Sequence, residues 1–406
     1  MDPITHGITG ALLGKGIFSD REGRMATFAA TLGAVFPDVD IVAEAISRDP
    51  LAIVKYHRGI THSFIALPFF ALLLALLTRY FTKRRGIPCP SWPTLTLIYG
   101  VGIASHILLD GTTSFGTRMW TPISQERVAW DLMFIIDFVL SSCVLLPQVL
   151  AWVYQGGNPS ATRKKATSMW VLFSVAALLV WGTALVAGYP FHIWIVLAAS
   201  ATLGVIFFLP ATNGWGFRMK RSAWCQAGIA VTAVYIGCCG LAHHAALQRV
   251  QDFAAENHID VVRMGALPVP PSLLDWGDVI RTNNGVYQAR FDLRNADRPD
   301  FYFVPDSPPN RFIETARALP EVRLYWTFAR YPTIHYFLED GYHVVDFSEH
   351  RFTNGNRRTP QPFSYRVVMN DEGTVVEEGW LQNGMFMQLM RRMEPAREKT
   401  PADKTQ

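Results

Sequence analysis

The chain has 406 residues, half of them hydrophobic, and a formal net charge of +4, so it is long enough to form more than one domain. Its mean hydropathy is only slightly positive because a strongly apolar part up to about His244 precedes a polar part from Gln248 onward. The basic residues gather in short blocks, which excludes an extended nucleic-acid-binding face. The five cysteines lack the CxxC spacing of thiolate metal sites.

The apolar part contains two short and six longer hydrophobic segments. The short ones, His6–Phe18 and Met25–Phe36, are joined by a polar turn and predict a helical hairpin beside a bundle. The longer ones approach the roughly 20 residues that a membrane-spanning helix needs. They are Ser63–Phe81, Thr94–Leu109, Leu132–Tyr154, Met169–Ala187, Phe191–Leu209 and Trp224–His243. The sequence therefore predicts an α-helical multi-pass membrane domain over residues 1–246.

Three basic blocks lie between these segments, as in the cytoplasmic loops of membrane proteins. They are Lys83–Arg85, Arg163–Lys165 and Arg218–Arg221. One orientation, with a tight outer turn at Gly188–Pro190, puts all three blocks in the cytoplasm. That orientation predicts an extracytoplasmic, periplasmic C-terminal domain. It also brings to the outer face His57, His62, His106 and Asp110.

The polar part predicts a soluble α+β domain, mostly β, over residues 247–392. Four segments alternate as half-buried strands do: Gly285–Leu293, Val322–Phe328, Tyr342–Phe347 and Phe363–Met369. Asn310–Leu319 fits a short helix. His335, His343 and His350 read as ordinary surface histidines, and residues 393–406 as a disordered tail.

Acids and histidines cluster where the apolar segments of the first third begin or end. Ionisable groups in or beside membrane segments are costly and therefore candidates for function. His106 and Asp110 are four residues apart and share a helix face. Histidine and carboxylate without paired cysteine is the ligand chemistry of a hydrolytic zinc, manganese or iron site. The candidate metal ligands are His6, Asp38, Asp40, His57, His62, His106 and Asp110.

Other residues near these ligands leave alternatives open. Asp40 or Asp2 is a candidate general base rather than a ligand. Arg58 is either an interfacial anchor or a phosphate clamp. Asp137 lies inside an apolar run, so it is expected either to support a ligand histidine or to bond a polar neighbour.

Simpler interpretations exist for single residues, because a lone histidine at a helix end is often interfacial and Asp38 fits a helix cap. Thr61 and Ser63 flank His62 and are expected to support it.

Four motifs carry a resemblance to a known family: Asp2-x-x-Thr-His6, Pro37-Asp-x-Asp40, His57-Arg-Gly-x-Thr-His-Ser63 and His106-x-x-x-Asp110. They resemble those of the bacterial inner-membrane metal-dependent hydrolase family, also described as domain of unknown function 457 or the LexA-binding hydrolase group. The resemblance covers roughly residues 1–155. It implies a membrane-bound, metal-dependent hydrolase. The polar C-terminal part lies outside the shared motifs.

The residues and the resemblance together predict an integral membrane hydrolase of the bacterial inner membrane. Its expected cofactor is a divalent metal, zinc first and manganese or iron as alternatives, with one or two ions bound. The expected substrate is an ester or phosphoester of a lipid or envelope molecule, and no nucleic-acid partner is expected. The alternative is a non-enzymatic metal-binding membrane sensor or transporter. In a third interpretation the C-terminal domain is an interaction module and the membrane part its anchor.

Overall fold

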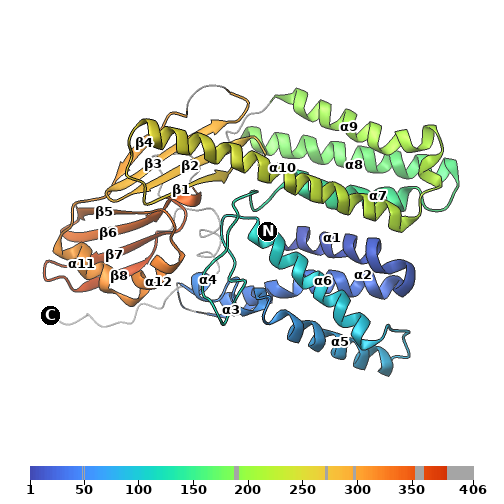
Figure 1. Ribbon diagram of the computed structural model, residues 1–406, viewed down its shortest axis with the longest axis horizontal. Coiled ribbons are helices and arrows are strands. Elements are labelled where there is room, and N and C mark those ends of the chain that lie inside the picture. The colour runs from blue at the N-terminus through green and yellow to red at the C-terminus, as the bar shows by residue number, and fades with distance from the viewer. Residues whose placement is uncertain are drawn as a thin grey trace, which may run out of the picture. The chain divides into compact units, whose positions relative to one another are not determined.

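A computed structural model describes residues 1–47, 49, 51–186, 192–269, 273–295, 299–352 and 361–381 (Figure 1). The chain divides into two compact units. Unit 1 contains Met1–Val39, Arg58–Trp130 and Ile135–Cys238, and unit 2 contains Asp40–His57, Asp131–Phe134 and the chain from Cys239 onward. The predicted turn at Gly188–Pro190 and the predicted tail at 393–406 lie outside the described residues.

Unit 1 is a bundle of apolar helices. They are α1 (Pro3–Leu13), α2 (Ser19–Val35), α5 (Leu67–Arg84), α6 (Trp92–Gly111), α7 (Phe138–Val153), α8 (Pro159–Val186), α9 (Ile193–Thr212) and the first half of α10 (Arg221–Glu256). By length and composition, the described residues contain five helices able to cross a membrane, or six if one bent pair counts as a span. That pair joins Ala52–His62 to α5 at an angle of 73°.

The third predicted span begins later than its hydropathy indicates. The apolar run starts at Leu132, but α7 starts at Phe138. The Asp137 carboxylate accepts hydrogen bonds from the backbone N–H groups of Val139 and Leu140, so it caps the helix there.

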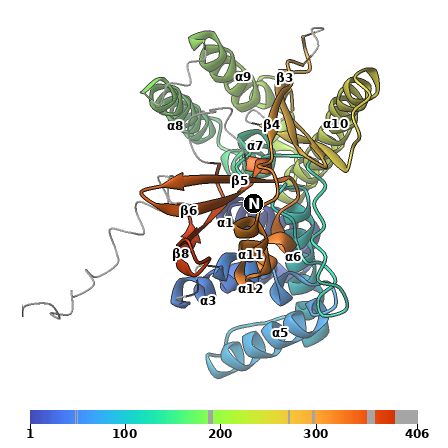
Figure 2. The same cartoon turned by 90° about the vertical axis from the view of Figure 1, so that its left-hand side faces the viewer.

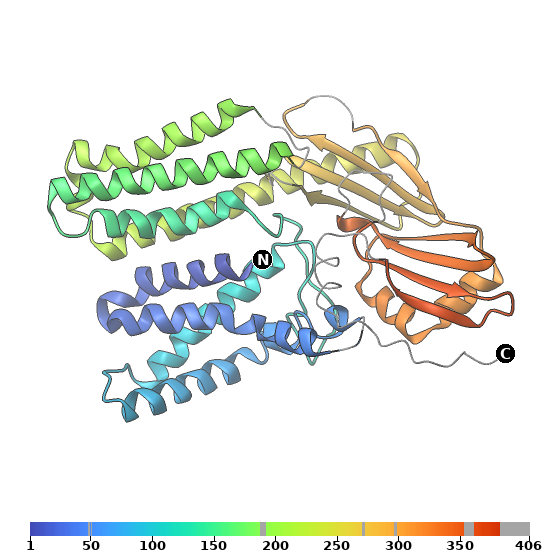
Figure 3. The same cartoon turned by 180° about the vertical axis from the view of Figure 1, so that it is seen from behind.

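Small residues let α1, α2 and α6 approach closely. A β-carbon at Gly10 of α1 would lie 2.5 Å from the Ala30 carbonyl oxygen of α2, and one at Gly102 of α6 would lie 2.5 Å from the same atom. Helix α2 is therefore held between two glycine-lined faces, the packing that apolar surroundings favour. A hairpin of α1 and α2 results, and the ends of α1 and α6 lie next to each other (Figures 1 and 3).

Unit 2 contains two four-stranded antiparallel sheets. The first has the order β1 (Arg263–Pro268), β2 (Asp275–Thr282), β3 (Gly285–Asp292), β4 (Tyr302–Pro305). The second has the order β5 (Pro332–Glu339), β6 (Tyr342–Glu349), β7 (Ser364–Met369), β8 (Val375–Trp380). Together with unit 1, these sheets confirm the predicted fold class of a helical membrane region followed by a mostly β region.

Helices cover a face of each sheet. The second half of α10 packs Ala246, Val250 and Ala254 against Trp276 and Ile280 of the first sheet. Helices α11 (Arg311–Ala318) and α12 (Pro320–Phe328) lie beside the second sheet (Figure 2). Two short helices of the same unit, α3 (Asp40–Ile46) and α4 (Ala52–Lys55), come from the N-terminal part of the chain.

Two predictions in this part were wrong. Val322–Phe328 is not a strand but most of α12, because Pro320 fixes the first helical turn and Val322, Tyr325 and Phe328 then share one buried face. His350 is not a surface residue, since it is only 3% exposed and shares a hydrogen bond with the Thr333 hydroxyl at 2.8 Å.

Asp278 is a buried acid in the middle of β2. It is 1% exposed and shares a strand face with Trp276 and Ile280. Among the residues that the structure describes, neither of its carboxyl oxygens has a hydrogen-bond partner. Burial raises the pKa of Asp278 well above its usual value, so the neutral form is favoured in the folded domain.

We predict that Asp278→Asn stabilises the C-terminal sheet increasingly as pH rises. A raised pKa means that the wild-type side chain loses stability as pH increases from its unfolded pKa to its folded one, whereas asparagine does not titrate. The variant should match wild type near pH 4. By pH 8 it should gain about tenfold in hydrogen-exchange protection for each unit of raised pKa.

The measurement is exchange of the β2 and β3 amides in the full chain, corrected for intrinsic rates, with the exposed Glu377→Gln as control. Equal hydrogen-exchange protection of variant and wild type at pH 8 would contradict the assignment of a raised pKa to the buried Asp278 carboxyl.

Candidate metal centre

Five ionisable side chains meet at one end of the unit 1 helices, and we call them the His/Asp cluster: His6, Asp38, His62, His106 and Asp110. His6 lies in the first turns of α1, Asp38 in the turn after α2, His62 in the short turn before α5, and His106 and Asp110 in the last turns of α6. Each of the three histidines is fully buried, and Asp110 is 1% exposed. Four separate chain segments therefore supply the cluster.

The cluster's donor atoms are close together. His62 Nε2 lies 3.0 Å from His106 Nε2 and 3.2 Å from Asp110 Oδ2. His106 Nε2 lies 3.5 Å from both Asp110 Oδ2 and Asp38 Oδ1, and His62 Nε2 lies 3.9 Å from Asp38 Oδ1.

A tetrahedral zinc ion with bonds of about 2.0–2.1 Å separates its ligand atoms by about 3.3–3.4 Å. The five observed distances bracket that separation, and Asp38, His62 and His106 have donor atoms close enough together to hold a metal ion.

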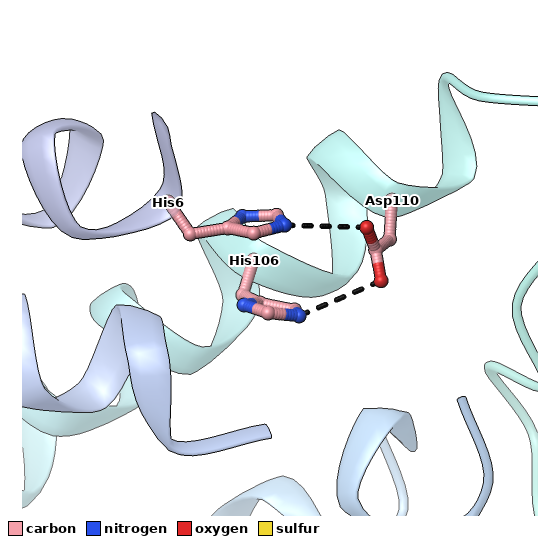
Figure 4. A group of neighbouring side chains, drawn as sticks. All are labelled: His6, His106 and Asp110. Atoms are coloured by element: carbon pink, nitrogen blue, oxygen red, sulfur yellow. Dashed lines mark hydrogen bonds and ion pairs between the residues drawn. The ribbon is translucent and has the colours of Figure 1, made fainter. Parts of the chain in front are cut away.

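His6 extends the cluster on one side of α6. Its ring stacks on the His106 ring with centroids 3.6 Å apart, and its Nε2 lies 3.2 Å from Asp110 Oδ1 (Figure 4). His6, His106 and Asp110 form a second possible metal-binding group beside the group of Asp38, His62 and His106. The two groups share His106, so an ion bound by either group would use this residue.

Hydrogen bonds outside the cluster orient its imidazole rings. His106 Nδ1 donates to the Ala34 carbonyl oxygen at 2.7 Å, so in the neutral ring Nε2 carries the lone pair that points at the cluster. The Thr61 hydroxyl lies 3.0 Å from His62 Nδ1. Ser63 donates to the Thr121 carbonyl oxygen at 2.5 Å, which ties the segment after His62 to the following loop.

Arg58 holds Asp110 in place. Its Nη2 lies 2.9 Å from Asp110 Oδ1, and its Nη1 donates to the Thr113 hydroxyl at 2.9 Å and to the Asp110 carbonyl at 3.3 Å. The α-amino group of Met1 also contacts Asp110 Oδ1. Arg58 is 2% exposed and has a left-handed φ of 56°, a conformation uncommon outside glycine. This ion pair was not among the roles that the sequence suggested for Arg58.

The remaining candidates have partners of their own. Asp2 caps α1, accepting hydrogen bonds from the backbone N–H and the hydroxyl of Thr5 at 2.9 and 2.7 Å. Asp137 caps α7 and accepts a hydrogen bond from the Tyr235 hydroxyl at 2.7 Å. Asp40 and His57 both belong to unit 2, where His57 Nδ1 lies 3.4 Å from Asp40 Oδ1.

Two groups that contribute to the site were not predicted from the sequence. The Ala34 carbonyl could not be predicted, because any residue has a backbone carbonyl and the sequence does not show where it points. Thr113 had a weak sequence signal, since it is a hydroxyl residue three positions after Asp110.

Comparisons with known proteins place the first half of the chain among inner membrane proteins. A family profile described as YdjM inner membrane protein matches residues 1–190. The inner membrane protein YbcI of Escherichia coli K12 is 31% identical over 143 residues, which are 34% of this chain and 78% of YbcI.

The uncharacterized protein YfhP of Bacillus subtilis 168 is 29% identical over 171 residues, which are 40% of this chain and 49% of YfhP. The chain thus spans about half the length of that relative. No solved structure matches.

We predict that His62→Ala and His106→Ala each remove most of the metal bound by the detergent-purified protein. Loss of one ligand from a site of few ligands costs far more than loss of an exposed histidine. Elemental analysis would measure the metal. The control is His335→Ala, an exposed histidine on β5, and an unchanged elution profile would show that the bundle remains folded. Stoichiometric metal in both cluster variants would contradict the assignment.

Proposed function

The chain belongs to the YdjM inner membrane protein family, and on that premise we propose that it is an integral inner-membrane hydrolase whose His/Asp cluster binds a divalent metal. The proposed substrate is an ester or phosphoester of a lipid or envelope molecule. The observation that carries the proposal is the close approach of buried donor atoms in two overlapping groups, one of His6, His106 and Asp110 and one of Asp38, His62 and His106. Zinc is the first candidate, and iron and manganese are the alternatives, because imidazole also suits iron and carboxylate suits manganese.

A divalent ion held by this cluster would acidify a water molecule and polarise the ester or phosphoryl oxygen. The protein's own residues prepare the site. The Ala34 carbonyl directs the His106 lone pair inward, and Arg58 fixes Asp110 so that its Oδ2 faces both His62 and His106.

We assign the general base to Asp40, paired with His57. Asp40 follows Asp38 by two residues and His57 directly precedes Arg58, so both are covalently tied to residues of the cluster. Asp2 is the weaker candidate, because both of its carboxylate oxygens already accept hydrogen bonds from Thr5.

A lipid substrate is supported by the loop that follows Asp110. Thr117 and Val128 pair through two backbone hydrogen bonds and form a hairpin, and beyond Val128 the Trp130 N–H donates to the Gly111 carbonyl. Trp120, Ile123 and Trp130 in this loop are 47%, 80% and 40% exposed. Tryptophan at the end of membrane helices favours the headgroup region, so this loop would hold the site at the depth where lipid ester bonds lie.

The burial of the cluster favours one alternative, a metal-binding sensor or transporter without catalysis. Three fully buried histidines leave little room for a large substrate unless the loop after Asp110 moves. Turnover therefore has to be measured together with metal content.

We predict metal-dependent turnover that Asp40→Asn lowers by about 100-fold or more while metal content stays, as loss of a general base does. The assay is hydrolysis of a panel of phospholipids and acyl esters in mixed micelles, with chelation and restoration by zinc, manganese or iron. Asp252→Asn, an exposed acid on α10, is the matched control. Equal loss of metal and turnover would make Asp40 a ligand. Bound metal without any turnover across the panel would favour the sensor or transporter.

We also propose that the cluster and the C-terminal unit face the periplasm. The basic residues that end α5 and begin α8 and α10 lie at the opposite end of the unit 1 helices from the cluster (Figures 1 and 3). Basic loops stay in the cytoplasm. An alkaline phosphatase fusion after Asn295 is therefore expected to be active, and a green fluorescent protein fusion at the same position dark. The reverse result would overturn this orientation.

A further inference from the structure

The surface of unit 1 carries a mostly apolar groove of about 570 Å³ between α1 and α7. Its walls include Ile4, Ile8 and Ala11 of α1, Leu145 and Val149 of α7, and Met169 of α8. Ile4 of α1 and Lys15, in the helical turn Gly14–Phe18 that follows α1, mark its two ends, and eleven residues of α-helix extend about 16 Å. That length is about the hydrocarbon depth of one membrane leaflet, roughly half of 30 Å.

Cationic side chains gather at one end of this groove. Lys15 and Arg221 both line it, and Arg221 is exposed at the first turn of α10. The Lys15 ammonium donates to the Gln148 side-chain oxygen at 2.8 Å, a neutral group that leaves its charge uncompensated by that contact. Lys165 lies 4.7 Å from the ring centroid of Trp152, another lining residue.

The first turn of α10 carries Arg221 and also has a carboxylate beside it. A helix N-terminus carries partial positive charge to which Arg221 adds a full charge, and the Asp20 carboxylate accepts a hydrogen bond from the Ser222 hydroxyl at 2.7 Å. The apolar wall, about one leaflet deep, matches the acyl chain of an anionic phospholipid. The cations at its end match the phosphate headgroup. Basic pockets between membrane helices bind such headgroups.

We propose that this groove binds one anionic diacyl phospholipid, with its phosphate at Lys15 and Arg221 and an acyl chain along α1 and α7. The site is separate from the His/Asp cluster, although α1 contributes to both. His6 lies on the buried side of α1, whereas Ile4 is 73% exposed. The proposal does not depend on hydrolase activity.

Native mass spectrometry tests the proposal. The protein is released from detergent to which phosphatidylglycerol or phosphatidylcholine has been added. We expect one phosphatidylglycerol to be retained in preference to phosphatidylcholine. Lys15→Gln and Arg221→Gln should each weaken retention about fivefold, since a basic residue near an anionic headgroup contributes about that factor. Ala11→Phe should also weaken it by filling the groove while leaving the charges intact.

The matched control is Lys83→Gln, which removes an exposed charge in the last turn of α5, outside the groove. It should leave retention unchanged. Metal content and elution volume report whether each variant is folded. Equal retention of the two lipids, or equal losses for Lys83→Gln and Lys15→Gln, would overturn the proposal and leave only non-specific lipid contact.

Discussion

The burial of the Asp110 carboxylate at the end of an apolar helix is the constraint on which the rest of the site depends. A carboxylate without partners is strongly unfavourable in such surroundings, so other groups must come to it. Arg58 and His62 do so from the segment before α5, His6 from α1, and His106 from one turn earlier on α6. The Met1 α-amino group adds a second cationic partner to the same carboxylate.

That arrangement requires close helix packing. Gly10 and Gly102 let α1 and α6 contact α2 at Ala30 from two directions, which brings the His6 and His106 rings into a stack. The chain also passes between the two units immediately beside the site, at Val39 to Asp40 and at His57 to Arg58. Within unit 2, Arg330 binds Asp131 through two hydrogen bonds of 2.9 and 2.8 Å.

Much of this architecture is readable from sequence because membrane helices and alternating strands have strong hydrophobic signatures. The motif around His62 and the spacing of His106 and Asp110 also indicated which side chains would meet. Local helix-start signals and tertiary contacts decided the rest. The Val322–Phe328 segment alternates as a strand does, yet its period-three residues fit a helix equally well, and Pro320 decides the outcome. Asp2 and Asp137 act as helix caps, a role that depends on where the helix starts. The orientation of His106 depends on a backbone carbonyl that no pattern reveals.

The most direct test of a metal centre at the His/Asp cluster is X-ray absorption at the metal edge of the purified protein. A site built from His62, His106, Asp38 and Asp110 should give only nitrogen and oxygen neighbours at about 2.0–2.1 Å, with outer-shell scattering from two imidazole rings. In His106→Ala the imidazole scattering should fall by half in whatever metal remains. A spectrum dominated by sulfur, or one without imidazole scattering, would contradict the assignment.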